Sequence, residues 1–168
     1  MKKAQLYGHI FIYILTITVT SFILIYGYNA IKNFQDKTDQ ASCIKFRNDL
    51  KSAVYTIMSD YGTVKRKDIG LCSNYNKVCF VETYRQISDR DNPALKPAGP
   101  IDPIIKDSIK SGTEKNVFLV ADVAKDGFYI GNITVEVGVD IYCVNAQNGK
   151  ISLKLEGMGD TVHVSKWE

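Results

Sequence analysis

The first part of the chain carries an uninterrupted apolar segment. From Ala4 to Ile31 the sequence contains no Asp, Glu, Lys or Arg, and its densest part runs from Ile10 to Tyr28. A helix of about 20 residues is long enough to cross about 30 Å of hydrocarbon. A single span in lipid must satisfy its own backbone hydrogen bonds, so the segment predicts a transmembrane helix although many of its residues are β-branched.

The apolar positions then change to a stripe at helical spacing. Steps of three and four residues dominate, with polar residues between the members of the stripe: Phe34, Ala41, Cys43, Phe46, Leu50, Ala53, Val54, Ile57, Met58 and Tyr61. No proline interrupts Leu6 to Tyr61, and Gly62 is a typical C-terminal stop. The pattern predicts a single helix of about 55 residues, transmembrane in its first half and amphipathic in its second.

Past Gly62 the apolar period changes to two, which is typical of strands. Residues 133–143 form the clearest alternation, and we expect one long strand there with Cys143 on its inward face. Asn148-Gly149 predicts a hairpin turn into the alternating residues 151–155. A last short strand is expected around Val162 and Val164.

Further strands are predicted upstream. Residues 64–71 and 78–83 predict a hairpin, and residues 117–123 predict a strand that Asp126-Gly127 turns back into 128–130. All four prolines fall within Asn92–Pro103, which predicts an extended loop. The stretch Ile104–Lys110 predicts a short helix that ends at Gly112.

Together these elements predict an α+β fold in three parts. Residues 1–31 are the leader and transmembrane helix, 32–62 the amphipathic continuation, and 63–168 an extracytoplasmic antiparallel β domain with the proline-rich loop at 92–103. The stripe on the helix and the apolar face of the sheet each need a cover. We therefore expect the long helix to pack on one antiparallel sheet.

Charge predicts the orientation of the span. Lys2 and Lys3 precede it, whereas the charges that follow nearly cancel: Lys32, Asp36, Lys37 and Asp39. The positive-inside rule places the N-terminus in the cytoplasm and the body outside. A cleaved secretory signal is the alternative, but its apolar core would be shorter and followed by small residues, unlike Asn33-Phe34-Gln35. Without Lys2 and Lys3, the chain has 19 of its 21 basic residues and 18 acidic ones, so its charges nearly balance. This balance predicts no basic surface for nucleic acid.

Four cysteines in an extracytoplasmic body predict disulfides: Cys43, Cys72, Cys79 and Cys143. Three pairings are open. We favour Cys72–Cys79, which would close the expected hairpin, together with Cys43–Cys143, which would link helix to sheet. By chain-entropy estimates the longer link contributes up to about 4–5 kcal/mol and the shorter about 2–3 kcal/mol. Buried free thiols are the remaining alternative.

No catalytic motif is present. The two histidines are His9, at the entry to the membrane, and His163, which we expect to face solvent. There is no serine elbow, phosphate-binding loop, GxGxxG or HExxH, and the cysteines lack the CxxC spacing of metal sites. We therefore expect no enzyme, cofactor, metal or small-molecule substrate. Asn132-Ile133-Thr134 is an N-glycosylation acceptor in form.

The layout resembles a type IV pilin or pilin-like protein, with a basic leader, an apolar segment, an amphipathic continuation and then a sheet. The start MKKAQLYGHIFIYIL is similar to a class III, prepilin-type signal, especially its archaeal form. The resemblance implies that a prepilin peptidase cuts between Ala4 and Gln5, and that the helix then leaves the membrane to pack with copies of itself. His9 stands where bacterial pilins carry Glu, a residue that archaeal pilins often lack.

The sequence thus predicts a membrane-anchored, pilin-like subunit of a cell-surface filament, structural or adhesive rather than catalytic. Its expected partners are the lipid bilayer and, through the N-terminal helix, other copies of the chain. The alternative is a static single-pass membrane protein whose ectodomain binds a partner or supports the envelope. A third hypothesis, an enzyme or redox protein, would need an active cysteine.

Overall fold

The computed structural model describes residues 3–83, 100–136 and 138–167. The chain forms two compact units, Met1–Gln40 and Ala41–Glu168. Helix α1 (Lys3–Met58) supplies the described part of the first unit and continues into the second, as the unbroken helical pattern predicts. It ends three residues before the expected Tyr61, and Gly62 lies in the following turn with a φ of 75°.

The second unit contains two sheets where the sequence predicted one. Sheet A has the strand order β1 (Val64–Gly70), β7 (Lys150–Gly157), β8 (Val162–Lys166) and β5 (Ile133–Val135), and its β5–β8 pair is parallel. Sheet B is antiparallel, in the order β4 (Ala124–Phe128), β3 (Val117–Val120), β2 (Lys77–Val81) and β6 (Ile141–Asn145). The chain is therefore α+β, with two mainly antiparallel sheets.

One predicted strand pairing and one predicted strand are wrong. β1 and β2 do not form a hairpin, because β1 pairs with β7 whereas β2 pairs with β3 and β6. The expected strand over residues 133–143 is two strands, β5 and β6, in different sheets. A turn interrupts the alternation: Val139 N donates to the Glu136 carbonyl, and Gly138 has a φ of 89°, which favours glycine.

One predicted turn is confirmed and another is wrong. Asn148 and Gly149 have φ angles of 51° and 72°, and Gln147 and Lys150 exchange backbone hydrogen bonds across them. Asp126-Gly127 is not a turn, because both residues lie inside β4. Gly127 faces Phe118 on β3, and a Cβ at that position would lie 2.9 Å from the Phe118 ring. The glycine makes room for an aromatic side chain.

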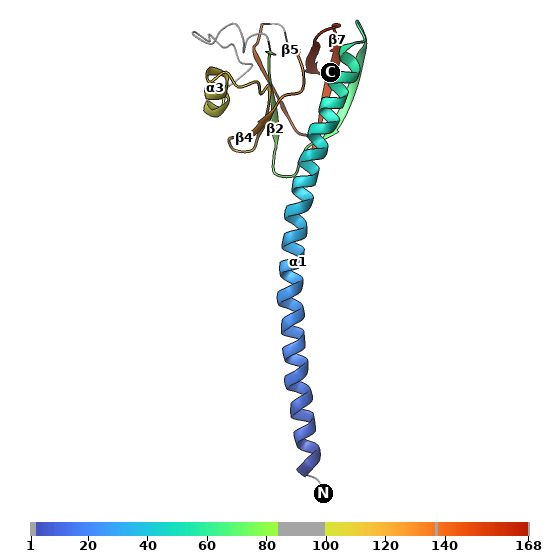
Figure 1. Cartoon of the computed structure of the whole chain (residues 1–168), viewed down its shortest axis with the longest axis vertical. Helices are drawn as coiled ribbons and strands as arrows, with labels where there is room; N and C mark the ends of the chain where they lie inside the picture. The colour runs from blue at the N-terminus through green and yellow to red at the C-terminus, as the bar shows by residue number, and fades with distance from the viewer. Residues whose placement is uncertain (1–2, 84–99, 137, 168) are drawn as a thin grey trace. The chain divides into compact units, whose positions relative to one another are not determined.

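Apolar side chains from both sheets and from α1 share one hydrophobic cluster. It includes Phe46, Leu50 and Ile57 of α1, and alternate residues of sheet A such as Leu153 and Val164. Sheet B contributes one face to this cluster and its other face to a second one, which also contains Ile105 and Ile109 of α3 (Pro103–Lys110). Within the second unit, sheet B therefore lies between α3 and the larger core (Figure 1).

The short helix predicted at residues 104–110 is confirmed as α3. Asp102 precedes it and stabilises its first turn, since one carboxylate oxygen accepts from Ile104 N at 2.8 Å. The other oxygen accepts from Ala124 N at 2.6 Å, which connects α3 to the start of β4. Of the predicted proline-rich loop at 92–103, residues 92–99 lie outside the described residues, and residues 100–102 have no regular secondary structure.

Candidate functional site

The first candidate site is the exposed apolar surface of α1 in the first unit. Its large apolar side chains are exposed on all sides of the helix: Ile10, Phe11, Ile12, Tyr13, Ile14, Leu15, Ile17, Val19, Phe22, Ile23, Leu24, Ile25, Tyr26, Tyr28, Ile31 and Phe34. Among the described residues, one helix is long and apolar enough to cross a membrane, and it contains this segment. An apolar surface of this size needs a cover other than water.

Hydroxyl groups along this surface bond to the helix itself. Thr16, Thr18, Thr20 and Ser21 each donate to a carbonyl three or four residues earlier, at 2.8–2.9 Å. These polar groups therefore place no demand on the surroundings, which is the condition for facing lipid or another apolar helix. The predicted cleavage position, between Ala4 and Gln5, lies at the second and third residues of α1 and stays a prediction.

The second unit contains two disulfides, but not in the favoured pairing. The bonds are Cys43–Cys72 and Cys79–Cys143, with Cα–Cα distances of 4.8 and 4.0 Å. The favoured pairing is wrong because it assumed a β1–β2 hairpin. Instead β2 pairs with β6, which places Cys79 directly opposite Cys143, and Cys143 is exposed rather than inward-facing. Disulfides form and persist in oxidising compartments, which indicates that this unit lies outside the cytoplasm.

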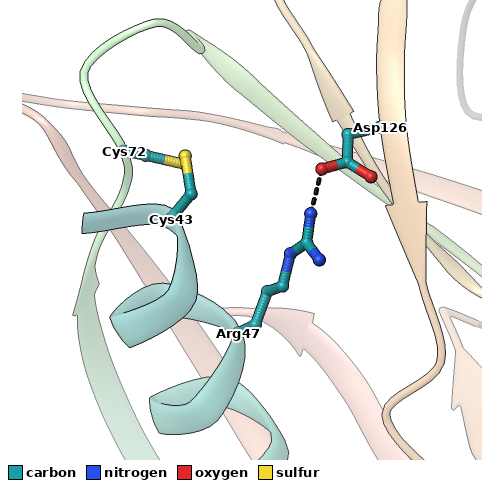
Figure 2. Close-up of a disulfide and its surroundings, with 4 residues drawn as sticks. All are labelled: Cys43, Arg47, Cys72 and Asp126. Atoms are coloured by element: carbon teal, nitrogen blue, oxygen red, sulfur yellow. Dashed lines mark hydrogen bonds and ion pairs between the residues drawn. A yellow bond between two sulfur atoms is a disulfide. The ribbon is translucent and has the colours of Figure 1, made fainter. Parts of the chain in front are cut away.

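An ion pair lies one helical turn from the first disulfide. Figure 2 shows Cys43 bonded to Cys72, while Arg47 extends from α1 to the carboxylate of Asp126 on β4. The Arg47 guanidinium also lies 5.3 Å from the centre of the Phe128 ring. Through these contacts, residues 43–47 of α1 are connected to the segment after β1 and to an edge strand of sheet B.

A buried polar residue that the sequence did not single out connects the two sheets. The Asn116 side chain, which is fully buried, donates to the Thr83 hydroxyl at 3.1 Å and to the Gly131 carbonyl at 2.7 Å, and accepts from Ile130 N at 3.1 Å. Thr83 accepts in turn from Ile133 N, at the start of β5. All these bonds are structural, because both amide hydrogens are used within the fold and the side chain is fully buried, out of reach of a ligand.

One cavity of about 650 Å³ lies between residues 42–56 of α1 and β1, lined by charges of both signs that include Lys45, Asp49 and Asp68. Ser152 and Arg66 hydrogen bond the Asp68 carboxylate and lower its pKa, so it is an anion at neutral pH rather than a proton donor. The residues that the structure describes contain no cluster of His, Cys, Asp and Glu that could hold a metal ion.

The predicted N-glycosylation acceptor lies on an exposed turn before β5. Asn132 is exposed, and its Oδ1 accepts a hydrogen bond from the Tyr129 hydroxyl at 2.9 Å. Thr134 is partly buried, with its hydroxyl 3.3 Å from Nδ1 of His163, which is itself partly buried rather than open to solvent. The side chain at 132 is therefore accessible in the folded unit, while the rest of the triplet belongs to the sheet.

No protein-family model, curated protein or solved structure matches this chain.

Proposed function

We propose that this chain is a pilin-like subunit, anchored in a membrane by α1 and later assembled through the same helix into a cell-surface filament. The observation that carries the proposal is the contrast within α1. Its first-unit part exposes apolar side chains on all sides, whereas its last turns contribute Phe46, Leu50 and Ile57 to the core of a disulfide-bonded body.

The proposal explains what covers the apolar surface. Lipid covers it while the subunit is stored in the membrane, and the helices of neighbouring subunits cover it after assembly. Both surroundings are apolar, so the self-bonded hydroxyls of Thr16, Thr18, Thr20 and Ser21 suit either one. No residue between positions 10 and 31 is charged. The helix can therefore move from lipid into contact with other helices without transferring a charge between them.

In this proposal the second unit, Ala41–Glu168, is the body of the subunit and lies outside the cytoplasm. Two disulfides and the basic residues Lys2 and Lys3 before the span support that orientation. The proposal also places residues 43–58 of α1 against the two sheets, which the shared hydrophobic cluster supports. The role of the body is structural or adhesive, not catalytic.

The decisive experiment is to determine the mature N-terminus in cells that produce a prepilin peptidase. Mass spectrometry is expected to find chains that begin at Gln5. The bulky side chain in Ala4→Leu should block cleavage, so that the full chain stays in the membrane and no filaments form. Ala4→Gly keeps a small residue at this position and should preserve cleavage and filament formation. Assembled filaments that retain Met1–Lys3 would contradict the proposal.

Cross-linking separates a filament subunit from a static membrane protein. Cysteine at the exposed positions Ile17 or Leu24 is expected to give disulfide-linked multimers in surface filaments seen by negative-stain microscopy. The native cysteines are paired with one another and do not compete. A chain that stays uncut and gives only monomers in detergent would instead support a static single-pass protein.

A further inference from the structure

We propose that Asn132 carries an N-linked glycan whose first sugar lies on the exposed rings of Tyr55 and Tyr129. This inference rests on the proposed extracytoplasmic location of the body, because oligosaccharide transfer to asparagine takes place on that side of the membrane. Asn132-Ile133-Thr134 is the only Asn-X-Ser/Thr triplet in the chain. The sequence alone does not say whether the triplet is accessible or what surrounds it.

The structure presents the Asn132 side chain at the surface. Gly131, directly before it, has a φ of 114°, which turns the chain into β5 and leaves the Asn132 side chain exposed. The hydroxyl of Tyr129 donates to Asn132 Oδ1 at 2.9 Å. This bond holds the amide by its oxygen and not by Nδ2, the atom to which a sugar is attached.

Two tyrosine rings lie beside this asparagine. Tyr129 is 38% exposed and Tyr55, from α1, is 50% exposed. The Lys51 ammonium lies over the Tyr55 ring, 5.8 Å from its centre, so a sugar on Tyr55 would use the rest of the exposed ring. A Cβ built on Gly131 would be 3.9 Å from the Tyr55 ring carbon that carries the hydroxyl, so Tyr55 reaches the residue next to Asn132. Burial raises the pKa of Tyr129, and the Tyr55 phenol adds to the rise.

Aromatic rings of this kind suit the first residue of a glycan. The C–H face of a pyranose ring is apolar and packs on the flat face of an aromatic side chain, while the tyrosine hydroxyls provide hydrogen bonds at the rim. Tyr129 lies three residues before Asn132 and contacts its side chain, and Tyr55, from α1, reaches the neighbouring Gly131, so two segments contribute a ring near the attachment point.

The reaction is a transfer of the glycan from a lipid carrier. Asn132 Nδ2 forms a bond to C1 of the first sugar, the bond from C1 to the carrier phosphate breaks, and the polyprenyl phosphate leaves with the electron pair. The amide proton goes to a carboxylate of the transferase, and nothing is oxidised or reduced. A lipid-linked oligosaccharide is therefore the co-reactant.

The timing of the transfer follows from the burial of the triplet. Ile133 is buried, Ile133 N donates to Thr83, and Val162 N donates to the Asn132 carbonyl. A transferase must bind the triplet as an extended segment, so it has to act before β5 joins the sheet. Because the Asn132 side chain stays exposed in the folded unit, the attached glycan does not obstruct that step.

The test is translation of the full chain in the presence of microsomal membranes that contain an N-oligosaccharyltransferase. The wild-type chain is expected to show one glycan-sized shift on a gel, removed by a glycan-releasing amidase. Asn132→Gln and the near-isosteric Thr134→Val should both abolish it. A control in the Asn132→Gln background adds Lys150→Thr, which creates an acceptor triplet that begins at Asn148 on the exposed hairpin turn.

The control separates failure of this inference from failure of the proposed function. If the chain with the acceptor at Asn148 shifts and the wild type does not, Asn132 is not a glycan site, although the body is on the luminal side. If neither chain shifts, the body does not cross the membrane, and both proposals fail. A shift of the wild type that disappears in Asn132→Gln supports the site.

The contact with the rings has its own test. Removing the glycan is expected to lower the melting temperature of the wild-type body by about 2–4 °C. The same treatment should have a similar effect in Tyr129→Phe, which keeps the ring, but little effect in Tyr129→Ala or Tyr55→Ala. Equal losses in all four proteins would show that the sugar does not lie on these rings.

Discussion

The two parts of α1 use similar apolar residues for opposite purposes. In the first unit Leu24 is 68% exposed, whereas in the second unit Leu50 is fully buried. The difference lies in the residues around them: no charged residue occurs from Ala4 to Ile31, whereas charged and polar residues separate the apolar positions on either side of Leu50. An apolar stripe can be covered by the chain itself, but an apolar surface on all sides requires a cover from outside.

The largest expected effect comes from a matched pair of leucine substitutions. Leu50→Ala should lower the free energy of unfolding of the body by about 3–5 kcal/mol, because it leaves a cavity in the core. Leu24→Ala removes the same atoms from an exposed position and should leave body stability within about 0.5 kcal/mol. Denaturant unfolding of the full chain in detergent measures both. Equal losses would show that the first unit takes part in the core of the second.

The second prediction concerns the two disulfides, which both lie in the second unit. The sequence separations are 64 residues for Cys79–Cys143 and 29 for Cys43–Cys72. Chain entropy gives upper estimates of about 4 and 3.5 kcal/mol respectively, so the Cys79→Ser/Cys143→Ser double variant should be the less stable. Chemical denaturation compares the two double variants.

Hydrogen exchange sharpens this comparison further. Loss of Cys43–Cys72 should increase exchange in α1 chiefly near residues 41–46, where the second unit begins. Loss of Cys79–Cys143 should instead affect β2 and β6, which that bond joins. Peptide mapping under non-reducing conditions is expected to find Cys43 linked to Cys72. A Cys43–Cys143 peptide would restore the pairing that the sequence favoured and would exclude the observed register of β2 against β6.

Local patterns predicted the elements of this protein better than their partners. The continuous helix, the alternating strand β7, the helix α3 and the Asn148-Gly149 turn depend on neighbouring residues, and each is present. Strand pairing is not local. The segment between β1 and β2, residues 71–76, suits a hairpin or a crossing between sheets equally well, and the structure has the crossing. The disulfide prediction failed with the hairpin on which it depended.

The candidate sites divide in the same way. The exposed apolar surface of α1 follows from its sequence, because a helix without charged residues is apolar on every side. The rings beside Asn132 could not be predicted, since Tyr55 and Tyr129 belong to elements far apart in the chain. The buried amide of Asn116 was also missed. A lone Asn before a strand gives no signal that distinguishes a structural hydrogen-bonding centre from a turn residue.

A smaller effect is expected from the ion pair at the start of the second unit. Asp126→Ala should lower the free energy of unfolding by about 1 kcal/mol, because it leaves the Arg47 guanidinium without its carboxylate partner. The Nε atom of Arg47 is already buried and has no hydrogen-bond partner among the described residues. Arg47→Met should lower the free energy of unfolding less, by about 0.5 kcal/mol, because the methionine side chain still packs on Phe128 and the Asp126 carboxylate that loses its partner is partly exposed to water. Thermal unfolding of the two variants gives the order. A greater loss in Arg47→Met would show that the cation–π contact, not the ion pair, stabilises this junction.

The smallest effect on stability is expected at an exposed contact of sheet A, in the second unit. Hydrogen bonds from Ser152, at 2.5 Å, and from Arg66 lower the pKa of Asp68 from its ordinary value. A carboxylate with a lowered pKa in the folded state stabilises that state above the unfolded pKa, and this contribution is lost as the pH falls through the folded pKa. Asp68→Asn should therefore be slightly less stable than wild type at neutral pH and should lose less stability on acidification below about pH 4. Melting temperatures of wild type, Asp68→Asn and Ser152→Ala across that range test this order, and parallel curves for all three proteins would mean that the Ser152 bond does not persist in solution.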